Sequence, residues 1–230
     1  MYAPNVVFLN GVCMDTRNNP RVTVVTRCEY LQSGLRALFC HDDVTLQFIR
    51  CIDDLVITDN DTLRILLVLD MSGPDALREF KAAVDFLNQI NTPRKIGVLV
   101  SRYNEYLTQY ISRKFRGRVT FFNAHNLESG LFRRNFLSWL KGKAVCPMRT
   151  VARFRDDRYG FSMKEWVTLV IPLSGESMQD IAECMGVHIQ SLYQIRQNAL
   201  KKIGLKSWRA FCELYLRGEI RTENNRVTLR

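Results

Sequence analysis

The chain has 230 residues, of which 47% are hydrophobic, and a formal net charge of +10. That length and apolar content suffice for two domains with cores of their own. No run of eighteen apolar residues would span a bilayer, and the first residues lack the basic start and long apolar run of a secretion signal, so we expect a cytoplasmic protein.

The seven cysteines are an odd number, are widely scattered and include no C-x-x-C pair. No histidine stands at metal-ligand spacing from them, so the sequence indicates no metal site. We expect buried thiols in a reducing compartment, with a redox-sensing cysteine as the alternative.

The first 140 residues alternate short apolar runs with amphipathic segments. Strands are expected at residues 22–26, 45–49, 63–69, 95–100 and 119–122, and helices at residues 30–39, 75–90, 104–115 and 127–140. Strands that alternate with helices favour a parallel sheet covered on both faces, so we predict an α/β doubly wound fold over residues 1–140. The apolar run at residues 6–9 fits either an added strand or the first strand itself.

Residues 141–159 show no clear periodicity and mix glycine, proline and many charges, which predicts a linker. From residue 141 onward there are sixteen Lys and Arg against nine Asp and Glu, whereas the first 140 residues hold seventeen against fourteen. The basic excess therefore lies in the C-terminal part, where it would attract a phosphate backbone. Because charge alone would also fit RNA or an anionic membrane, only the helix arrangement selects duplex DNA.

Residues 160–220 carry the pattern of an all-α, four-helix domain whose middle pair forms a helix-turn-helix. The first helix of that pair begins at Ser177, a hydroxyl N-cap, and ends at Gly186. The second begins at residue 188 or 189 and contains no acidic residue. Its apolar stripe consists of Leu192, Ile195, Ala199, Leu200 and Ile203.

Residues 161–205 resemble, without a gap, the LuxR-type DNA-binding domain that ends the NarL and FixJ class of bacterial response regulators. The positions that carry the resemblance are Phe161, Ser162, Leu169, Gly175, Ile181 to Glu183, Met185 to Val187, and Leu200 to Leu205. The sequence departs from the family at Ser191 and Leu192, where Thr and Val are usual, and at Ile195, where histidine is common. It also places Pro172 in the first helix, which predicts an end or kink near Ile171.

The second helix of the motif turns polar side chains away from its apolar stripe. Tyr193, Gln194 and Gln197 lie there, and they coincide with the base-reading positions that the family resemblance implies. Glutamine can pair with adenine through two hydrogen bonds, and tyrosine can contact a thymine methyl or donate its hydroxyl. Phosphate contacts are expected from five further residues: Ser177, Ser191, Arg196, Lys201 and Lys202.

Residues 206–217 predict a fourth helix whose apolar side includes Phe211, Leu214 and Tyr215. In the LuxR type this helix often forms the two-fold contact between DNA-binding domains. A single such domain makes a small interface, so we expect two copies on two half-sites. Trp208 fits either a core position or that contact.

The first domain resembles a response-regulator receiver domain. Asp70 closes a buried strand and matches the phosphoacceptor, and Ser101 matches the hydroxyl that responds to phosphate. The acidic pair that holds magnesium in a receiver falls on Thr26 and Arg27, however, and the lysine after the last strand falls at about Asn123. Because a hard divalent cation needs oxygen ligands, we expect a degenerate receiver in which Asp70 is a vestigial phosphoacceptor.

These features predict a bacterial transcriptional regulator of the LuxR class that acts without conventional aspartyl phosphorylation, as a homodimer or with a related regulator. A co-regulator that works by protein contact and has little DNA affinity alone is one alternative, and a phosphorylated switch at Asp70 is another. No nucleophile with a base and an orienting group stands out, and neither does a phosphate loop, so we expect no enzyme. No cofactor and no membrane partner are expected.

Overall fold

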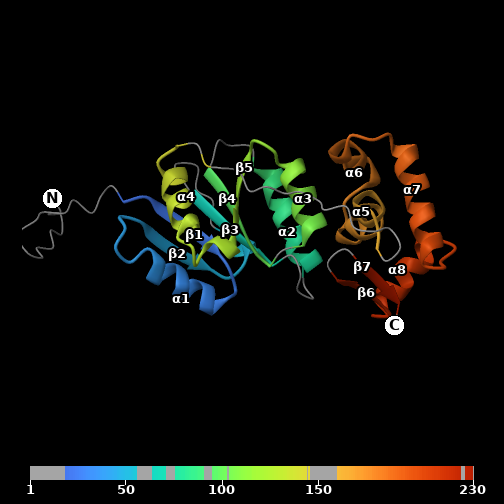
Figure 1. Cartoon of the computed structure of the whole chain (residues 1–230), viewed down its shortest axis with the longest axis horizontal. Coiled ribbons are helices and arrows are strands. Elements are labelled where there is room, and N and C mark those ends of the chain that lie inside the picture. Colours follow the sequence, from blue (N-terminus) through green and yellow to red (C-terminus); the bar gives the residue numbers. More distant parts are fainter. Residues whose placement is uncertain are drawn as a thin grey trace, which may run out of the picture.

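A computed structural model describes residues 19–55, 64–70, 76–90, 95–102, 104–143, 145, 160–223 and 226–229. Within these ranges the chain forms an α/β unit followed by a helical unit (Figure 1). Residues 6–9 and nearly all of the predicted linker lie outside the described residues, so the domain limits at residues 140, 159 and 220 stay predictions.

The α/β unit is built on a five-stranded sheet in the order β2-β1-β3-β4-β5, with every neighbouring pair parallel. The strands are β1 (Arg21–Val25), β2 (Thr45–Ile49), β3 (Arg64–Asp70), β4 (Lys95–Arg102) and β5 (Val119–Asn123). The central strand β3 buries Ile65, Leu66, Leu67 and Leu69, as a strand covered on both faces must. The predicted doubly wound architecture is confirmed.

Four helices cover the two faces of this sheet (Figure 1). They are α1 (Glu29–Leu38), α2 (Ala76–Gln89), α3 (Glu105–Lys114) and α4 (Leu131–Leu140). Leu66 and Phe122 pack with side chains of α1 and α4, whereas Ile65 and Leu67 pack with those of α2 and α3. Alternate residues of one strand therefore supply two separate cores.

The connection between β2 and β3 departs from the regular alternation of strands and helices. Among its described residues it contains only a short 3-10 helix, η2 (Ile52–Asp54). Strand β2 lies at the edge of the sheet, and its Thr45 and Gln47 are exposed. Polar side chains at these positions suit a strand with a solvated face.

The helical unit contains α5 (Met163–Val170), η4 (Ile171–Ser174), α6 (Met178–Met185), α7 (Ile189–Lys202) and α8 (Trp208–Leu216). Helix α5 gives way to the 3-10 helix η4 at Ile171, directly before Pro172, as the missing amide donor predicts. The apolar stripe of α7 is also found as expected, with Leu192, Ala199 and Leu200 buried.

A two-stranded antiparallel hairpin follows α8 and was not expected from the sequence. It pairs β6 (Ile220–Glu223) with β7 (Arg226–Leu229). Ile220 and Val227 are buried in the same hydrophobic cluster as the helices, so the hairpin extends the core of the helical unit.

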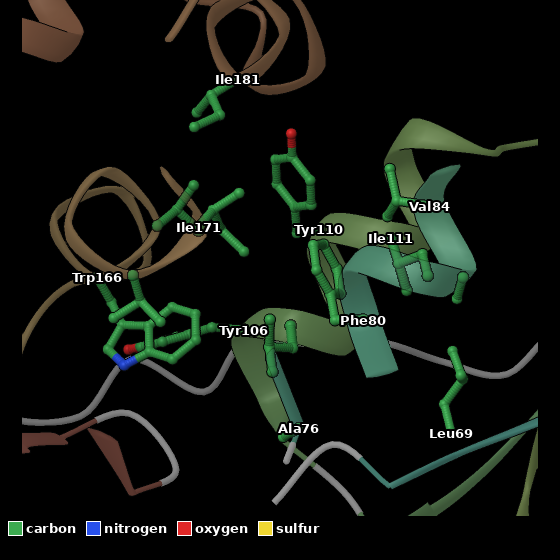
Figure 2. Close-up of a cluster of buried hydrophobic side chains, with 14 of the residues drawn as sticks. Leu69, Ala76, Phe80, Val84, Tyr106, Tyr110, Ile111, Trp166, Ile171 and Ile181 are labelled. Atoms are coloured by element: carbon green, nitrogen blue, oxygen red, sulfur yellow. The ribbon is translucent and has the colours of Figure 1, made fainter. Parts of the chain in front are cut away.

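The two units share one hydrophobic core. The cluster between the sheet and α2 and α3 continues into α5, η4 and α6 (Figure 2), and it also includes buried side chains of α7. The ring of Tyr106 lies 5.7 Å from that of Trp166, which is 1% exposed. The Tyr106 hydroxyl also donates a hydrogen bond of 2.8 Å to the carbonyl of Phe161.

A polar cluster borders this shared core. Glu176, which precedes α6, accepts a hydrogen bond of 3.0 Å from the hydroxyl of Tyr110 and forms an ion pair with Lys114. Burial, together with the negative charge of Glu176, raises the pKa of Tyr110, so its hydroxyl stays protonated and continues to donate. The contacts fix the helical unit against α3.

Five cysteines lie in the described part of the chain, and their exposure differs from expectation. Cys28 and Cys40 are exposed, and Cys51, Cys184 and Cys212 are half-buried, so the expectation of buried thiols is wrong for them. Across the described ranges, no helix is both long and apolar enough to span a bilayer.

Candidate nucleic-acid interface

The helix-turn-helix is assembled by caps that the sequence specifies. The hydroxyl of Ser177 accepts a hydrogen bond of 3.1 Å from the amide of Asp180 and starts α6. Gly186 ends α6 with φ at 63°, in the left-handed region that glycine adopts without strain. His188 caps α7, because its Nδ1 accepts a bond of 3.3 Å from the amide of Gln190. These caps set the short turn that joins the two helices.

Helix α7 lies on the outer side of the helical unit, away from the sheet (Figure 1). Tyr193, Gln194 and Gln197 are all exposed on it, and their spacing along a helix places them on one face. We call these three residues the reading face. The side-chain amide of Gln194 donates a hydrogen bond of 3.3 Å to Asn198, which leaves its carbonyl oxygen available to a partner. The structure brings the three predicted base-reading residues together.

The five predicted phosphate contacts occupy different surroundings. Ser191 and Lys201 are exposed on α7. The hydroxyl of Ser177 lies 2.6 Å from the carboxylate of Asp180, so a negative charge stands beside it. Lys202 forms an ion pair of 2.7 Å with Glu165.

Glu165 links the start of α5 to the end of α7. Its carboxylate accepts a hydrogen bond of 2.9 Å from the amide of Ser162, whose hydroxyl in turn caps the helix, and it also binds Lys202. Partial burial acts to raise the pKa of Glu165, but the bonds from Lys202 and Ser162 outweigh it and hold that pKa below its ordinary value. The sequence alone did not reveal this pair.

Arg196, the fifth predicted phosphate contact, is half-buried against two aromatic rings. Its guanidinium carbon lies 4.9 Å from the ring centre of Tyr193 and 5.0 Å from that of Trp208. Burial lowers the pKa of the guanidinium, although it stays charged at any physiological pH. The spacing of Tyr193 and Arg196, three residues apart on one helix, is the sequence signal that could have indicated part of this stack.

The carboxyl end of the sheet holds the residues that match a receiver site. Thr26, Arg27, Asp70 and Ser101 line one cavity of about 840 Å³, together with Glu79. These four positions therefore lie at one cavity, which we call the sheet-end cavity. At the two positions where a receiver carries acidic residues, this chain has the hydroxyl of Thr26 and the guanidinium of Arg27.

Hydrogen bonds within the chain engage several of these groups. The amide of Asp70 donates 3.3 Å to Glu79, and the hydroxyl of Ser101 donates 3.2 Å to the carbonyl of Leu69. Asn123, at the position of the expected lysine, accepts a bond of 2.9 Å from the amide of His125 and caps a turn.

The sheet-end cavity does not fit a magnesium site. Thr26 is 5% exposed, and its hydroxyl accepts a hydrogen bond from the amide of Cys28, while Arg27 adds a positive charge. Among the described residues, no group of three His, Cys, Asp or Glu side chains is placed to hold a metal ion. The carboxylates of Asp70, Glu79 and Glu128 also line the cavity, but they are not grouped so that they could hold a divalent cation together.

Comparison with known proteins identifies distant structural relatives. No family model matches this chain, and no curated protein is detectably similar. The RcsB response regulator of Salmonella typhimurium aligns over 87% of this chain and 99% of its own, at 18% identity and a TM-score of 0.42. The response regulator ChrA of a heme-sensing two-component system aligns over 87% and 98%, at 14% and 0.41. An RcsB–DNA complex aligns over 87% and 98%, at 16% and 0.43.

These solved structures are response regulators, the class that the sequence resembles. Their identities and TM-scores are too low to carry a functional argument. We therefore infer function from the residues of this chain.

Proposed function

We propose that this protein is a DNA-binding transcriptional regulator of the LuxR class that reads duplex DNA with α7 and needs no aspartyl phosphorylation. The observation that carries the proposal is the reading face. Tyr193, Gln194 and Gln197 project from a capped helix that follows a short glycine turn, and the α/β unit packs on the other side of the domain. A helix presented in this way can enter a major groove.

Each reading-face glutamine has chemistry suited to a base edge. A bidentate pair between glutamine and adenine discriminates against the wrong base by about 1–3 kcal/mol. Lys201 and Ser191, both exposed on α7, would supply contacts to the phosphate backbone. Specificity would come from the glutamines and Tyr193, and salt-dependent affinity from the cations.

The residues of the sheet-end cavity support the proposed independence from phosphorylation. A receiver needs magnesium to neutralise the transferred phosphoryl group, and Thr26 and Arg27 cannot supply the carboxylates that hold it. The α/β unit would then act as a packing and docking platform, with no enzymatic role.

Two copies would bind together, as a homodimer or with a related regulator, because one such domain covers few base pairs. Helix α8 offers a surface for that contact, since Leu216 is 83% exposed on it.

A co-regulator with little DNA affinity of its own is the second candidate, and one observation favours it. Three of the five predicted phosphate contacts are engaged within the chain, since Ser177 bonds Asp180, Lys202 pairs with Glu165 and Arg196 stacks on Tyr193 and Trp208. Groups so engaged contribute less to a phosphate contact than free ones do.

Selection of bound fragments from a random duplex pool tests the proposal. The purified full-length chain, without any phosphodonor, should enrich a motif with two half-sites. The double variant Gln194→Ala, Gln197→Ala should lose the preference for that motif, whereas Gln89→Ala, which alters an exposed glutamine of α2, should keep it. Binding without any motif would favour the co-regulator, and a preference unchanged in the double variant would show that α7 is not the reading helix.

A further inference from the structure

A stack of side chains connects the reading face to the core of the helical unit. Tyr193, which is 45% exposed, lies against Arg196, and Arg196 lies against Trp208 of α8. Trp208 in turn stacks on Phe211, with ring centres 5.1 Å apart and planes 20° apart. Phe211 is fully buried, so the stack begins at the protein surface and ends in the core.

The Arg196 side chain is held between the rings of Tyr193 and Trp208. Its Nε is buried and has no hydrogen-bond partner among the described residues, a cost that an arginine free to reach solvent would avoid. Attraction between a guanidinium and two aromatic rings offsets that cost, and such contacts grow stronger as they lose water. The arrangement therefore restrains both Arg196 and the ring that it touches.

Restraint of the Tyr193 ring would lower the entropy cost of placing it against a base when α7 binds DNA. A half-exposed tyrosine on an open helix face samples several rotamers, and ordering such a side chain on binding costs affinity. With Arg196 against its face, the phenol is held in one orientation before any partner arrives. A ring fixed in advance discriminates between bases better than one that can turn aside.

We propose that Arg196 and Trp208 are positioning residues that hold the Tyr193 ring for base contact, so that α8, outside the groove, sets sequence preference at one base pair. This inference rests on the proposed function, since it assumes that α7 reads DNA. It also gives Arg196 a role other than that of a simple phosphate contact. A phosphate contact alone would change affinity for all sequences alike.

The experiment is selection from a random duplex pool with full-length protein, comparing wild type with Tyr193→Ala, Trp208→Leu, Trp208→Phe and Arg196→Gln. Tyr193→Ala identifies the base pair that the ring meets. Trp208→Leu and Arg196→Gln should lower the preference at that same base pair by about tenfold and leave the other positions of the motif unchanged. Trp208→Phe keeps a ring for Arg196 and should retain most of the preference.

The double variant Tyr193→Ala, Trp208→Leu completes the test. If Trp208 acts through Tyr193, the double variant should be no worse at that base pair than Tyr193→Ala alone, because the two changes remove one interaction. Thermal unfolding of each variant confirms that it is folded at the temperature of selection, and a variant that is not folded is assayed below its melting temperature.

The possible failures are distinguishable. A wild-type protein that enriches no motif overturns the proposed function and this inference together. A wild-type motif that Trp208→Leu leaves intact at every position overturns the positioning role alone. Arg196→Gln could instead lower the affinity for all sequences alike, with a salt dependence that corresponds to one fewer released counterion. That result, without a change in base preference, would make Arg196 a phosphate contact only.

Discussion

The α/β unit and the helical unit have kept different parts of what their sequences resemble. The α/β unit has the strand order of a receiver, yet Thr26 and Arg27 stand at the sheet-end cavity where a receiver carries two acidic residues. The helical unit preserves both its helices and the exposed polar face of α7. Packing constrains most positions of a fold, whereas chemistry depends on a few, so the same architecture can carry different residues at its site.

The largest expected difference between the two units concerns the hydrophobic core that they share. Trp166→Ala should lower the free energy of unfolding by about 3–5 kcal/mol, because it removes a fully buried indole from the shared core. Trp139→Ala, in the separate core beneath α1 and α4, should destabilise to a similar degree. Chemical denaturation measures both.

The two variants should differ in how the units hold together. Only Trp166→Ala should speed proteolytic cleavage between the units under native conditions, since the hydrophobic cluster that holds Trp139 includes no described residue of the helical unit. Equal cleavage of both variants would show that the shared core does not control the contact.

A smaller effect should separate reading from folding. Gln197→Ala should weaken binding to the selected motif by about 1–3 kcal/mol, as the loss of one bidentate base contact predicts. The free energy of unfolding of this variant should stay within about 0.5 kcal/mol of wild type, because the Gln197 side chain is exposed. Titration of labelled duplex at fixed salt measures the first, and a loss of equal size on random duplex would contradict the role in base reading.

The ion pair between Glu165 and Lys202 should give the helical unit a pH dependence. The folded-state pKa of Glu165 lies below its ordinary value of 4.5. Ionised Glu165 therefore stabilises the fold at pH values above 4.5, and this stabilisation is lost as the pH falls through the folded-state pKa. Glu165→Gln should destabilise by about 0.5–1 kcal/mol at pH 7 and by less below pH 4.5.

A matched control for that pair lies on α8. Glu213 pairs with Arg209 at 2.9 Å, but its side chain is 48% exposed and that of Arg209 is 88% exposed. Glu213→Gln should therefore change stability less than Glu165→Gln at pH 7, with unfolding followed by circular dichroism. If the two variants behave alike, the partly buried site adds nothing to the ion pair.

The smallest expected effect concerns the sheet-end cavity. If the protein acts without aspartyl phosphorylation, as proposed, Asp70→Asn should leave DNA affinity within about 0.5 kcal/mol of wild type. Incubation of the wild type with acetyl phosphate and magnesium should add no phosphate by intact mass. Uptake of phosphate that Asp70→Asn abolishes would restore the phosphorylated switch.

Much of this architecture could be predicted because it depends on local patterns. The apolar run at residues 63–69 predicts β3, and Pro172 predicts the end of α5, since each acts on its own stretch of backbone. The hairpin after α8 was missed, although Asn224 and Asn225 between alternating residues are a turn signal.

Contacts between distant residues could not be predicted in the same way. Tyr110 and Glu176 lie 66 positions apart, and no periodicity relates them. The stack of Arg196 on Trp208 joins two helices whose crossing the sequence does not specify. Such contacts depend on how elements pack, which is a property of the whole chain.

The shared core also bears on how this protein can be taken apart. A fragment that begins near residue 160 would leave the apolar side chains that now meet Tyr106 and Phe80 without cover, so it should self-associate or dissolve poorly. Failure of such a fragment to bind DNA would reflect the loss of the α/β unit that covers its apolar surface and would not show that α7 has no role in binding. Co-expression of the two halves as separate chains should instead recover a soluble pair, because the surfaces that join them are already complementary.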